Sequence, residues 1–131
     1  MTFPVSIKGV VLDEQQRVLL LRNDRDEWEL PGGRIEIGET PQQTVVREIA
    51  EEIGWTVTAG PLLDAWLYRI AQVDRHVFVV TYGCPLVSGG EPVLSAEHRG
   101  FGLFAADELP GLPLPDGYRR AIAAWRWRTA S

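Results

Sequence analysis

The sequence predicts an α/β sandwich with a mixed sheet. Short apolar runs rich in valine, isoleucine and leucine recur along most of the chain and are bounded by polar or glycine-rich turns, which is typical of strands. Only two stretches have the periodicity and the boundary residues of helices. One of these helices lies near the middle of the chain and the other at its end.

The N-terminal third is predicted to be extended. Residues 5–12 and 17–21 have the composition of two strands joined by a polar turn. A charged loop over residues 22–27 follows and leads into a short strand, residues 28–30. That strand enters Pro31-Gly32-Gly33, where two glycines allow the backbone to approach a ligand or to adopt a positive φ.

The central helix follows, between Thr40 and Gly54. Thr40 suits the N-cap, Pro41 suits the first turn, and Gln43 completes a capping box with Thr40. Gly54 is able to take the left-handed conformation that closes a helix. At 100° per residue, one face of this helix is apolar and a neighbouring strip is acidic. The apolar positions are Val45, Val46, Ile49, Ala50 and Ile53, and the acidic ones are Glu48, Glu51 and Glu52.

The C-terminal half contains further strands and a second helix. Its extended runs are 56–58, 62–70, 76–82 and 101–104. Residues 71–75 suit a hairpin connection, and 107–109 suit a single helical turn before a proline-rich loop. The final helix is predicted over 116–128, with Arg119 and Arg126 facing solvent. The side chains predicted to face the core are Tyr118, Ile122 and Trp125.

Length and charge argue against several classes of partner. A chain of 131 residues is predicted to form one domain, residues 1–131, large enough for a core without disulfides or a structural metal. The formal net charge of −5 argues against sequence-independent binding of nucleic acid and against binding to an anionic membrane surface. A small anionic substrate would therefore be held by metal ions and local arginines. The sequence leaves a monomer and a homodimer open.

Cysteine usage and hydropathy indicate a cytoplasmic protein. The single cysteine, Cys84, excludes an internal disulfide and fits a reducing compartment, and we expect it to be a small buried apolar residue. Residues 1–12 lack the basic start and apolar core of a signal peptide. No apolar run approaches the roughly 18 residues of a membrane span. A cytoplasmic location without a membrane partner is therefore the expectation.

The acidic strip of the central helix is unfavourable unless a cation binds it. Like charges at helical spacing repel by roughly 0.2 to 0.5 kcal/mol per pair. Carboxylates in the last turn also oppose the negative end of the helix dipole, at a cost of about 0.3 to 1 kcal/mol each when exposed. Arg47 is one compensating cation, but a single guanidinium cannot neutralise three carboxylates. Hard oxygen ligands clustered in this way suit Mg²⁺ or Mn²⁺.

Together these residues resemble the signature of a known family. Gly33, five residues, Glu39, seven residues and then the run from Arg47 to Gly54 are similar to the complete Nudix box of the Nudix hydrolases. Every fixed position of the motif is present, and only Trp55 departs from it, because an aliphatic residue is usual there. The likeness extends upstream through 28–33 and, more loosely, downstream through Glu97-His98 to 107–110.

The resemblance implies a fold and a reaction. Nudix domains place a curved mixed sheet between helices, with the box as loop, helix and loop beside the sheet. Family members hydrolyse a pyrophosphate bond in a nucleoside diphosphate linked to another group. Water attacks phosphorus while two or three divalent cations neutralise the phosphate oxygens. By the same resemblance the metal ligands are Glu48, Glu51 and Glu52, with the Gly32 carbonyl as a backbone partner.

Other residues receive roles from the resemblance. Arg47 and Glu39 are expected to orient the metal ligands and to tie the loop to the helix, with an ordinary surface ion pair as the alternative. Glu97 resembles the loop glutamate that serves many family members as a further metal ligand or general base. Leu103, however, stands where the family often has tryptophan. The proton acceptor therefore stays open between Glu48 and Glu97.

Candidate substrate-binding residues lie close to the box. Arg22 and Arg34 are candidates for phosphate contact, with solvent exposure as the alternative. Trp28 is a candidate for stacking on a nucleobase, although most tryptophans in a domain of this size belong to the core. For His76 and His98 we expect structural or surface roles, because neither has metal-ligand spacing.

The expected function is metal-dependent hydrolysis of a nucleotide, with a nucleoside triphosphate or a modified one as the default substrate. The proline of ADP-ribose hydrolases is absent at Ile70-Ala71, and the tyrosine of dinucleoside polyphosphate hydrolases is absent near Gln72. The alternative is a non-catalytic Nudix-fold nucleotide-binding or sensor protein, which loss of box glutamates would mark; none is lost here. The isoprenoid isomerase branch relies on additional Cys and Glu residues, and Cys84 lies far from the box.

Overall fold

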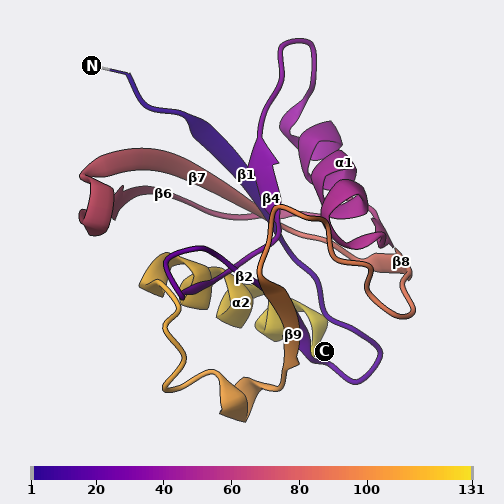
Figure 1. Cartoon of the computed structure of the whole chain (residues 1–131). Helices are drawn as coiled ribbons and strands as arrows, with labels where there is room; N and C mark the ends of the chain where they lie inside the picture. Colours follow the sequence, from indigo (N-terminus) through magenta and orange to yellow (C-terminus); the bar gives the residue numbers. More distant parts are fainter. Residues whose placement is uncertain (1, 131) are drawn as a thin grey trace.

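The fold is an α/β structure with a mixed sheet, as the sequence predicts (Figure 1). The computed structural model describes residues 2–130. Its strands are β1 (Val5–Val10), β2 (Val18–Arg22), β3 (Trp28–Glu29), β4 (Gly32–Arg34), β5 (Thr56–Val57), β6 (Leu62–Ile70), β7 (Arg75–Gly83), β8 (Leu86–Ser88) and β9 (Gly100–Phe104). Its helices are α1 (Pro41–Ile53) and α2 (Asp116–Thr129), with the single turns η1 (Ala71–Val73) and η2 (Ala106–Glu108).

The largest sheet has four strands in the order β4-β1-β7-β6. Strand β1 runs parallel to β7 and antiparallel to β4, which makes the sheet mixed. Strand β2 pairs with both β3 and β9, and β5 pairs with β8, in two smaller antiparallel sheets. Because β4 pairs with β1, the glycine-rich segment that precedes α1 is held at one edge of the large sheet.

Two apolar cores flank the large sheet. Helix α1 contributes Val45, Ile49 and Ile53 to one core, together with Ile7 of β1, which is 1% exposed. Ala50, predicted on the same face, is exposed, because the buried side of the last turn is taken by Glu52 and Ile53. Helix α2 contributes its inner face to the other core, together with Val10 of β1. Figure 1 shows the two helices on different sides of β1 and β7. The sheet therefore lies between two helices, as the family resemblance implies.

The predicted ends of the central helix are confirmed. The hydroxyl of Thr40 accepts a hydrogen bond from the Gln43 N–H at 3.2 Å, and the Gln43 side chain accepts one from the Thr40 N–H at 2.9 Å. Pro41 is the first helical residue, and Gly54 closes the helix with a φ of 77°. The Gly54 N–H donates to the carbonyl oxygen of Ala50. Each of these capping residues bonds to a residue only three or four positions away, so the sequence is sufficient to predict the helix ends.

Two short strands differ from the predicted elements. The sequence places a turn at 31–33, whereas residues 32–34 form β4, paired with β1. Strand β8 is not predicted at all, and it pairs with β5 through two residue pairs only. Both strands are too short to show the alternation of a strand. Their pairing with distant segments defines them.

Helix α2 confirms the predicted inner face and corrects the predicted outer face. The buried side chains of this face include Tyr118, Ile122 and Trp125. Arg119 does not face solvent: its guanidinium donates to three carbonyl oxygens of the 109–114 loop at 2.6 to 3.0 Å. Arg126 donates to the carbonyl oxygens of Gln16 and Phe104. Irregular loops leave carbonyl groups without backbone partners, and these arginines supply donors for them.

The expected burial of Cys84 is also confirmed. Its thiol is free and 0% exposed. Burial raises the pKa of the thiol to about 12, so Cys84 is a small apolar core residue and not a reactive nucleophile. Within residues 2–130, neither helix has the length and apolar character that crossing a membrane requires.

Candidate active site

Strand β4 and helix α1 meet through two glutamates of the helix. The backbone N–H of Gly32 donates to Glu52 Oε1 at 2.8 Å. A Cβ atom at Gly33 would lie 2.5 Å from the carboxylate of Glu48, so that carboxylate fits there because residue 33 has no side chain. Two of the three glutamates predicted as metal ligands therefore rest on the glycine segment.

Arg47 joins the acidic strip to the loop before the helix. Its Nε donates to Glu39 Oε2 at 2.6 Å and its Nη2 to Glu39 Oε1 at 3.0 Å, a bidentate pair. Its Nη1 donates to Glu48 at 3.0 Å and to Glu51 at 3.2 Å. The bonds from Arg47 lower the pKa of Glu39 to about 2, and the bonds to Glu39 raise the pKa of the guanidinium. One cation thus brings three predicted site carboxylates together.

Glu52 is the buried member of the acidic strip. It is 5% exposed, and burial raises the pKa of its carboxyl to about 7, although Lys8 and the Gly32 N–H favour the charged form. The Nε2 atom of His98 lies 3.4 Å from Glu52 Oε2. With a pKa of about 7, this carboxyl is about half ionised at pH 7, because the positive charge around it does not outweigh its burial. A cation added at this place would favour the carboxylate.

A buried charge network behind Glu52 is absent from the sequence-based expectations. Lys8, 7% exposed, has its Nζ 3.8 Å from Glu29 Oε2, and His98 Nε2 lies 3.6 Å from Glu29 Oε1. Burial opposes charge on Lys8 and Glu29, but their mutual attraction outweighs it, lowering the pKa of Glu29 to about 2 and raising that of Lys8. The bond to Glu29 also raises the pKa of His98. His98 therefore lies in the site and not on the surface.

A signal for this network does exist in the sequence. Lys8 is the only lysine of the chain, and it stands inside an apolar strand. Lysine is almost never fully buried unless it is paired, so a buried lysine implies a buried acidic partner. The identity of that partner is not readable from the sequence, because Glu29 belongs to a different sheet from β1.

Replacing Glu29 by Gln should destabilise the protein by about 3 kcal/mol at pH 7, because it leaves the buried Lys8 ammonium without a counter-charge. Urea denaturation in chelator measures this effect, with Glu14→Gln, an exposed carboxylate, as the control. The pKa of Glu29 is lowered, so its stabilisation is present above the unfolded value of about 4.5 and is lost as pH falls towards about 2. A destabilisation that is the same at pH 3 and pH 7 would contradict this account.

The donor set of the acidic strip fits a hard divalent cation. Glu48, Glu51 and Glu52 offer only carboxylate oxygens, the ligands that Mg²⁺ and Mn²⁺ prefer. Within residues 2–130, no three acidic, histidine or cysteine side chains already stand at metal-ligand spacing. Arg47 holds Glu48 and Glu51, so both would have to turn towards Glu52 to share a cation. The predicted Gly32 carbonyl ligand belongs to the glycine segment on which Glu52 rests.

Glu97 lies on the loop between β8 and β9. The N–H groups of Val93 and Ser95 tie this loop to the end of α1 by donating to the carbonyl oxygens of Ile53 and Glu52, both at 2.9 Å. The Glu97 side chain is exposed and, among residues 2–130, forms no hydrogen bond or ion pair. Glu97 is thus beside the site along the chain, but it is not joined to the acidic cluster. Its role remains a prediction.

The three candidate substrate-binding residues are separated into two places. Trp28 packs edge to face on Phe104 at 4.9 Å, and the Arg22 guanidinium lies over the Trp28 ring at 5.8 Å. Arg22 also pairs with Asp26 at 3.3 Å, so its charge is partly satisfied. Arg34 follows Gly33 on β4, with an exposed guanidinium that has no partner among residues 2–130.

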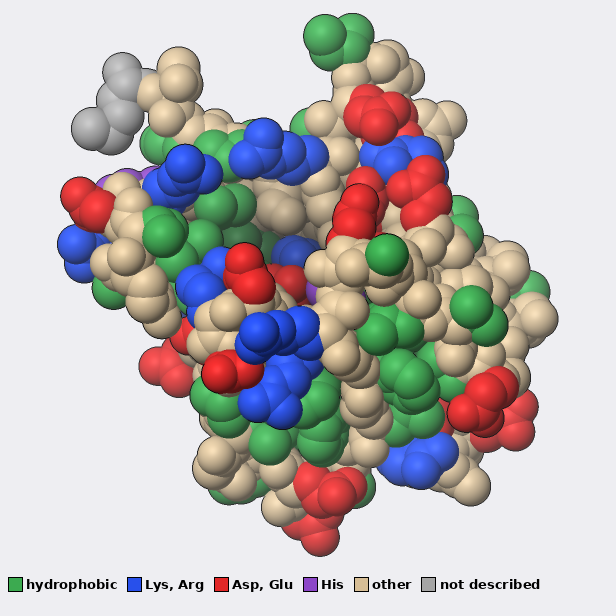
Figure 2. Space-filling view, viewed as in Figure 1, with side chains coloured by type: hydrophobic (Ala, Val, Ile, Leu, Met, Phe, Trp, Pro, Cys, Tyr) green, Lys and Arg blue, Asp and Glu red, His purple; other side chains and the backbone are tan. Residues whose placement is uncertain are grey.

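Two hollows open near these residues. One, of ≈ 480 Å³, lies between the segment before β1, strand β4 and the β6–β7 hairpin. The other, of ≈ 410 Å³, is lined by Trp66 and Tyr68 together with charged groups that include Glu27 and Arg120. Figure 2 shows a hollowed face with acidic side chains along α1 and basic side chains across from them. The charges of this face are mixed, because Arg47 binds the carboxylates of α1 and Asp26 pairs with both Arg22 and Arg99.

Comparison with known proteins gives consistent matches. A family model described as NUDIX domain matches residues 2–125. The 8-oxo-dGTP diphosphatase of Escherichia coli is 38% identical over 74 residues, covering 53% of this chain and 56% of that protein. An ADP-ribose pyrophosphatase of Methanocaldococcus jannaschii is 28% identical over 112 residues, covering 82% and 65%. The crystal structure of a MutT NUDIX hydrolase from Burkholderia pseudomallei superposes with a TM-score of 0.79 at 28% identity, covering 95% and 98%.

The matches differ in how much of each relative they span. The chain covers between 52% and 66% of the length of the first four curated relatives. Two of the matched proteins are named for different nucleotide substrates, 8-oxo-dGTP and ADP-ribose. The matches therefore show what kind of domain this is, and they leave its substrate to be argued from the site.

Proposed function

The chain belongs to the Nudix family, and on that premise we propose that it is a divalent-cation-dependent pyrophosphohydrolase. Its substrate in this proposal is a nucleoside diphosphate linked to another group, with a nucleoside triphosphate or a modified one preferred. Relatives named for 8-oxo-dGTP and for ADP-ribose support the general substrate class. A cytoplasmic location belongs to the same proposal, supported by the free, unreactive thiol of Cys84.

The observation that carries the proposal is the state of the acidic strip. Three carboxylates share one helix surface, and within residues 2–130 the guanidinium that binds two of them, Glu48 and Glu51, is that of Arg47, which is already engaged with Glu39. The most buried of the three, Glu52, has its pKa raised to about 7 by burial. A set of hard ligands that lacks positive charge is what a site for divalent cations looks like before the cation binds.

In this proposal each residue of the site has a separate role in the reaction. Glu48, Glu51 and Glu52, with the Gly32 carbonyl, would hold the cations. When bound, these cations supply positive charge to the phosphate oxygens and make water more acidic. Arg47 positions Glu48 and Glu51 through hydrogen bonds, and Glu39 fixes Arg47. Glu97 or Glu48 would accept the proton of the attacking water.

Substrate contacts in this proposal come from both hollows. Trp66 and Tyr68, with ring centroids 4.9 Å apart, offer aromatic surface to a nucleobase. Trp28 is 74° from the plane of Phe104 and is partly covered by Arg22, so stacking there would require Arg22 to move. Arg22 and Arg34 remain candidates for phosphate contact.

Activity should require Mg²⁺ or Mn²⁺ and rise towards alkaline pH, because the ligands are carboxylates and the attacking species is deprotonated water. A panel of nucleotides, assayed for release of phosphate and pyrophosphate with Mg²⁺ or with excess chelator, tests both the metal and the substrate class. Full turnover in chelator would refute the metal dependence. Absence of turnover on every nucleotide with either metal would refute the enzymatic proposal.

Replacing Glu97 by Gln should lower kcat by about 10² to 10⁴ if this residue is the general base, which is the usual effect of removing one. The melting temperature should hardly change, because the side chain is exposed. Glu91→Gln, on the same loop and also exposed, is the matched control. If kcat of Glu97→Gln stays within about threefold of wild type across the pH range, at saturating substrate and Mg²⁺, the role passes to Glu48.

A further inference from the structure

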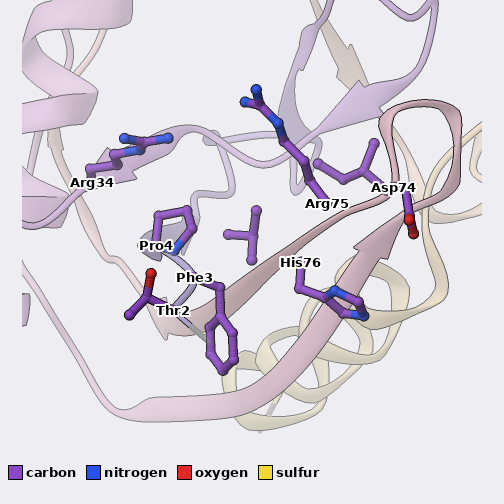
Figure 3. A pocket seen from close by; sticks show the side chains of 9 residues that line it. Thr2, Phe3, Pro4, Arg34, Asp74, Arg75 and His76 are labelled. Carbon is purple, nitrogen blue, oxygen red and sulfur yellow. The ribbon is translucent and has the colours of Figure 1, made fainter.

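The hollow beside β4 is built largely from strand ends. Its ≈ 480 Å³ are bounded by residues 2–4, by Arg34, and by Ile70 and residues 74–77 of the β6–β7 hairpin. Figure 3 shows the side chains of Arg34 and Arg75 on one side of the strands, whereas those of Phe3 and His76 point the other way. The charged groups that this side of the hollow offers to a ligand are therefore two guanidiniums.

These two guanidiniums differ from the other arginines of the chain. The sequence contains twelve arginines. Six of them pair with carboxylates outside the acidic strip, namely Arg17, Arg22, Arg25, Arg69, Arg99 and Arg120. Arg47 binds the strip, Arg119 and Arg126 donate to carbonyl oxygens, and Arg128 has a partner as well. Of the arginines within residues 2–130, only Arg34 and Arg75 have side chains that form no hydrogen bond, ion pair or ring contact, and both line the same hollow.

The one carboxylate at this hollow does not neutralise them. Asp74 lines the hollow, but its Oδ1 accepts from Arg69 at 3.0 Å and 3.3 Å. A chain with a net charge of −5 has eighteen acidic residues available to pair with its cations. Two arginines that line one hollow and have no partner among residues 2–130 indicate a place for an anion that the chain itself does not supply.

This place adjoins the acidic strip. Arg34 directly follows Gly33, against which the Glu48 carboxylate rests, and the Arg34 carbonyl accepts from Arg47 Nη2 at 3.4 Å. Strand β1 lies between β4 and β7, so Arg34 and Arg75 approach the hollow from the two strands that flank β1. An anion between the two guanidiniums would therefore sit next to phosphates that the acidic strip binds through cations.

We propose that Arg34 and Arg75 together bind a third phosphate of the substrate. The scissile bond joins the other two phosphates. This inference rests on the proposed function, because it names the substrate class of the same site. A nucleoside triphosphate carries one phosphate more than the bond requires, whereas a nucleoside diphosphate sugar carries a neutral sugar at that place. Guanidiniums match phosphate oxygens in geometry and only donate hydrogen bonds, while a sugar needs acceptors as well. The hollow thus selects triphosphates over diphosphate sugars.

Nucleotides that differ by one phosphate provide the sharpest test. Binding of non-hydrolysable analogues of dGTP and of dGDP is measured by calorimetry with Mg²⁺ at low ionic strength, for wild type, Arg34→Gln, Arg75→Gln and the double variant. Each single change should weaken dGTP binding about tenfold, and the double change about a hundredfold, while dGDP binding changes by less than about threefold. Arg17→Gln, which removes one positive charge at the Asp13 turn, is the control for net charge.

A kinetic experiment with Mg²⁺ compares a nucleoside triphosphate, dGTP, with a nucleoside diphosphate sugar, ADP-ribose. In the double variant kcat/KM should fall about a hundredfold for dGTP, mainly through KM, and by less than about threefold for ADP-ribose. Equal losses of binding for dGTP and dGDP, or no loss for either, would overturn the proposal. The binding arm does not depend on turnover. A wild type that hydrolyses no nucleotide of the panel refutes the enzymatic function, and selective loss of binding of the dGTP analogue still supports the anion site.

Discussion

Replacing Glu52 by Gln is expected to lower kcat by about 10³ while making the metal-free protein more stable at pH 8. Loss of one carboxylate ligand removes several kcal/mol of charge stabilisation for the phosphate oxygens, which corresponds to a loss of this order. Gln keeps an oxygen that can accept the Gly32 N–H, so the junction between β4 and α1 survives. The variant therefore separates loss of a ligand from loss of the fold.

The gain in stability follows from the raised pKa of Glu52. Because this carboxyl titrates at about 7 in the folded protein and at about 4.5 when unfolded, its ionisation destabilises the fold progressively as pH rises from 4.5 to 7. Gln does not ionise, so the variant should gain on the order of 3 kcal/mol over wild type at pH 8 and nothing at pH 4. Urea denaturation in chelator at both pH values measures the difference, with Glu14→Gln as the control.

The Glu52→Gln variant should also differ from wild type in how strongly Mg²⁺ stabilises it. Saturating Mg²⁺ should stabilise the wild type at pH 8 more than it stabilises the variant, since cation binding requires the carboxylate. A variant that keeps near wild-type kcat would remove Glu52 from the metal site. A variant that loses activity and also unfolds more easily at pH 8 would show that Glu52 is needed for the fold.

Gly33→Ala should strongly lower activity although it changes no charged or polar side chain. Its Cβ would come within 2.5 Å of the Glu48 carboxylate, which would have to move away from β4. A displacement of about 1 Å in a site that positions reacting groups can cost about 10²-fold in rate. Residue 33 is not among the glycines with positive φ, so the backbone itself accepts alanine.

Gly100→Ala provides the matched control for Gly33. A Cβ at residue 100 meets nothing within 4 Å, and the same pair of residue types is exchanged. We expect Gly33→Ala to lower kcat about 100-fold and to raise the Mg²⁺ concentration needed for half-maximal rate, with a small change in melting temperature. Activity of Gly33→Ala within threefold of Gly100→Ala would mean that Glu48 shifts without consequence and is not held in a required position.

Several features of the central helix can be predicted from the sequence alone. Thr40, Gln43 and Gly54 act within a few residues of the helix ends, so the order of residues is enough to predict their capping interactions. The acidic strip is predictable for the same reason, because helical spacing alone sets which side chains share a face. The bidentate contact between Arg47 and Glu39 is expected from the motif, and the structure forms it.

Only the tertiary structure decided which of these charges are buried and what surrounds them. Nothing in the sequence indicates that Glu52 is more buried than Glu51, because that difference depends on where β4 and the loop before β9 lie against the helix. The partnership of Lys8 with Glu29 and His98 joins three segments that no periodicity relates. The pairing state of Arg34 and Arg75 likewise depends on where every other charged side chain lies.

Local hydrogen bonding and side-chain spacing depend on residues a few positions apart. Through them this protein's sequence determined its two helices, its longer strands and its acidic strip, but not the short strands β4 and β8. Burial of charge depends on segments that meet only after the chain folds, because desolvation is a property of everything that surrounds a group. The tertiary structure therefore decided the raised pKa of Glu52, the buried Lys8 network and the unpartnered arginines beside the site.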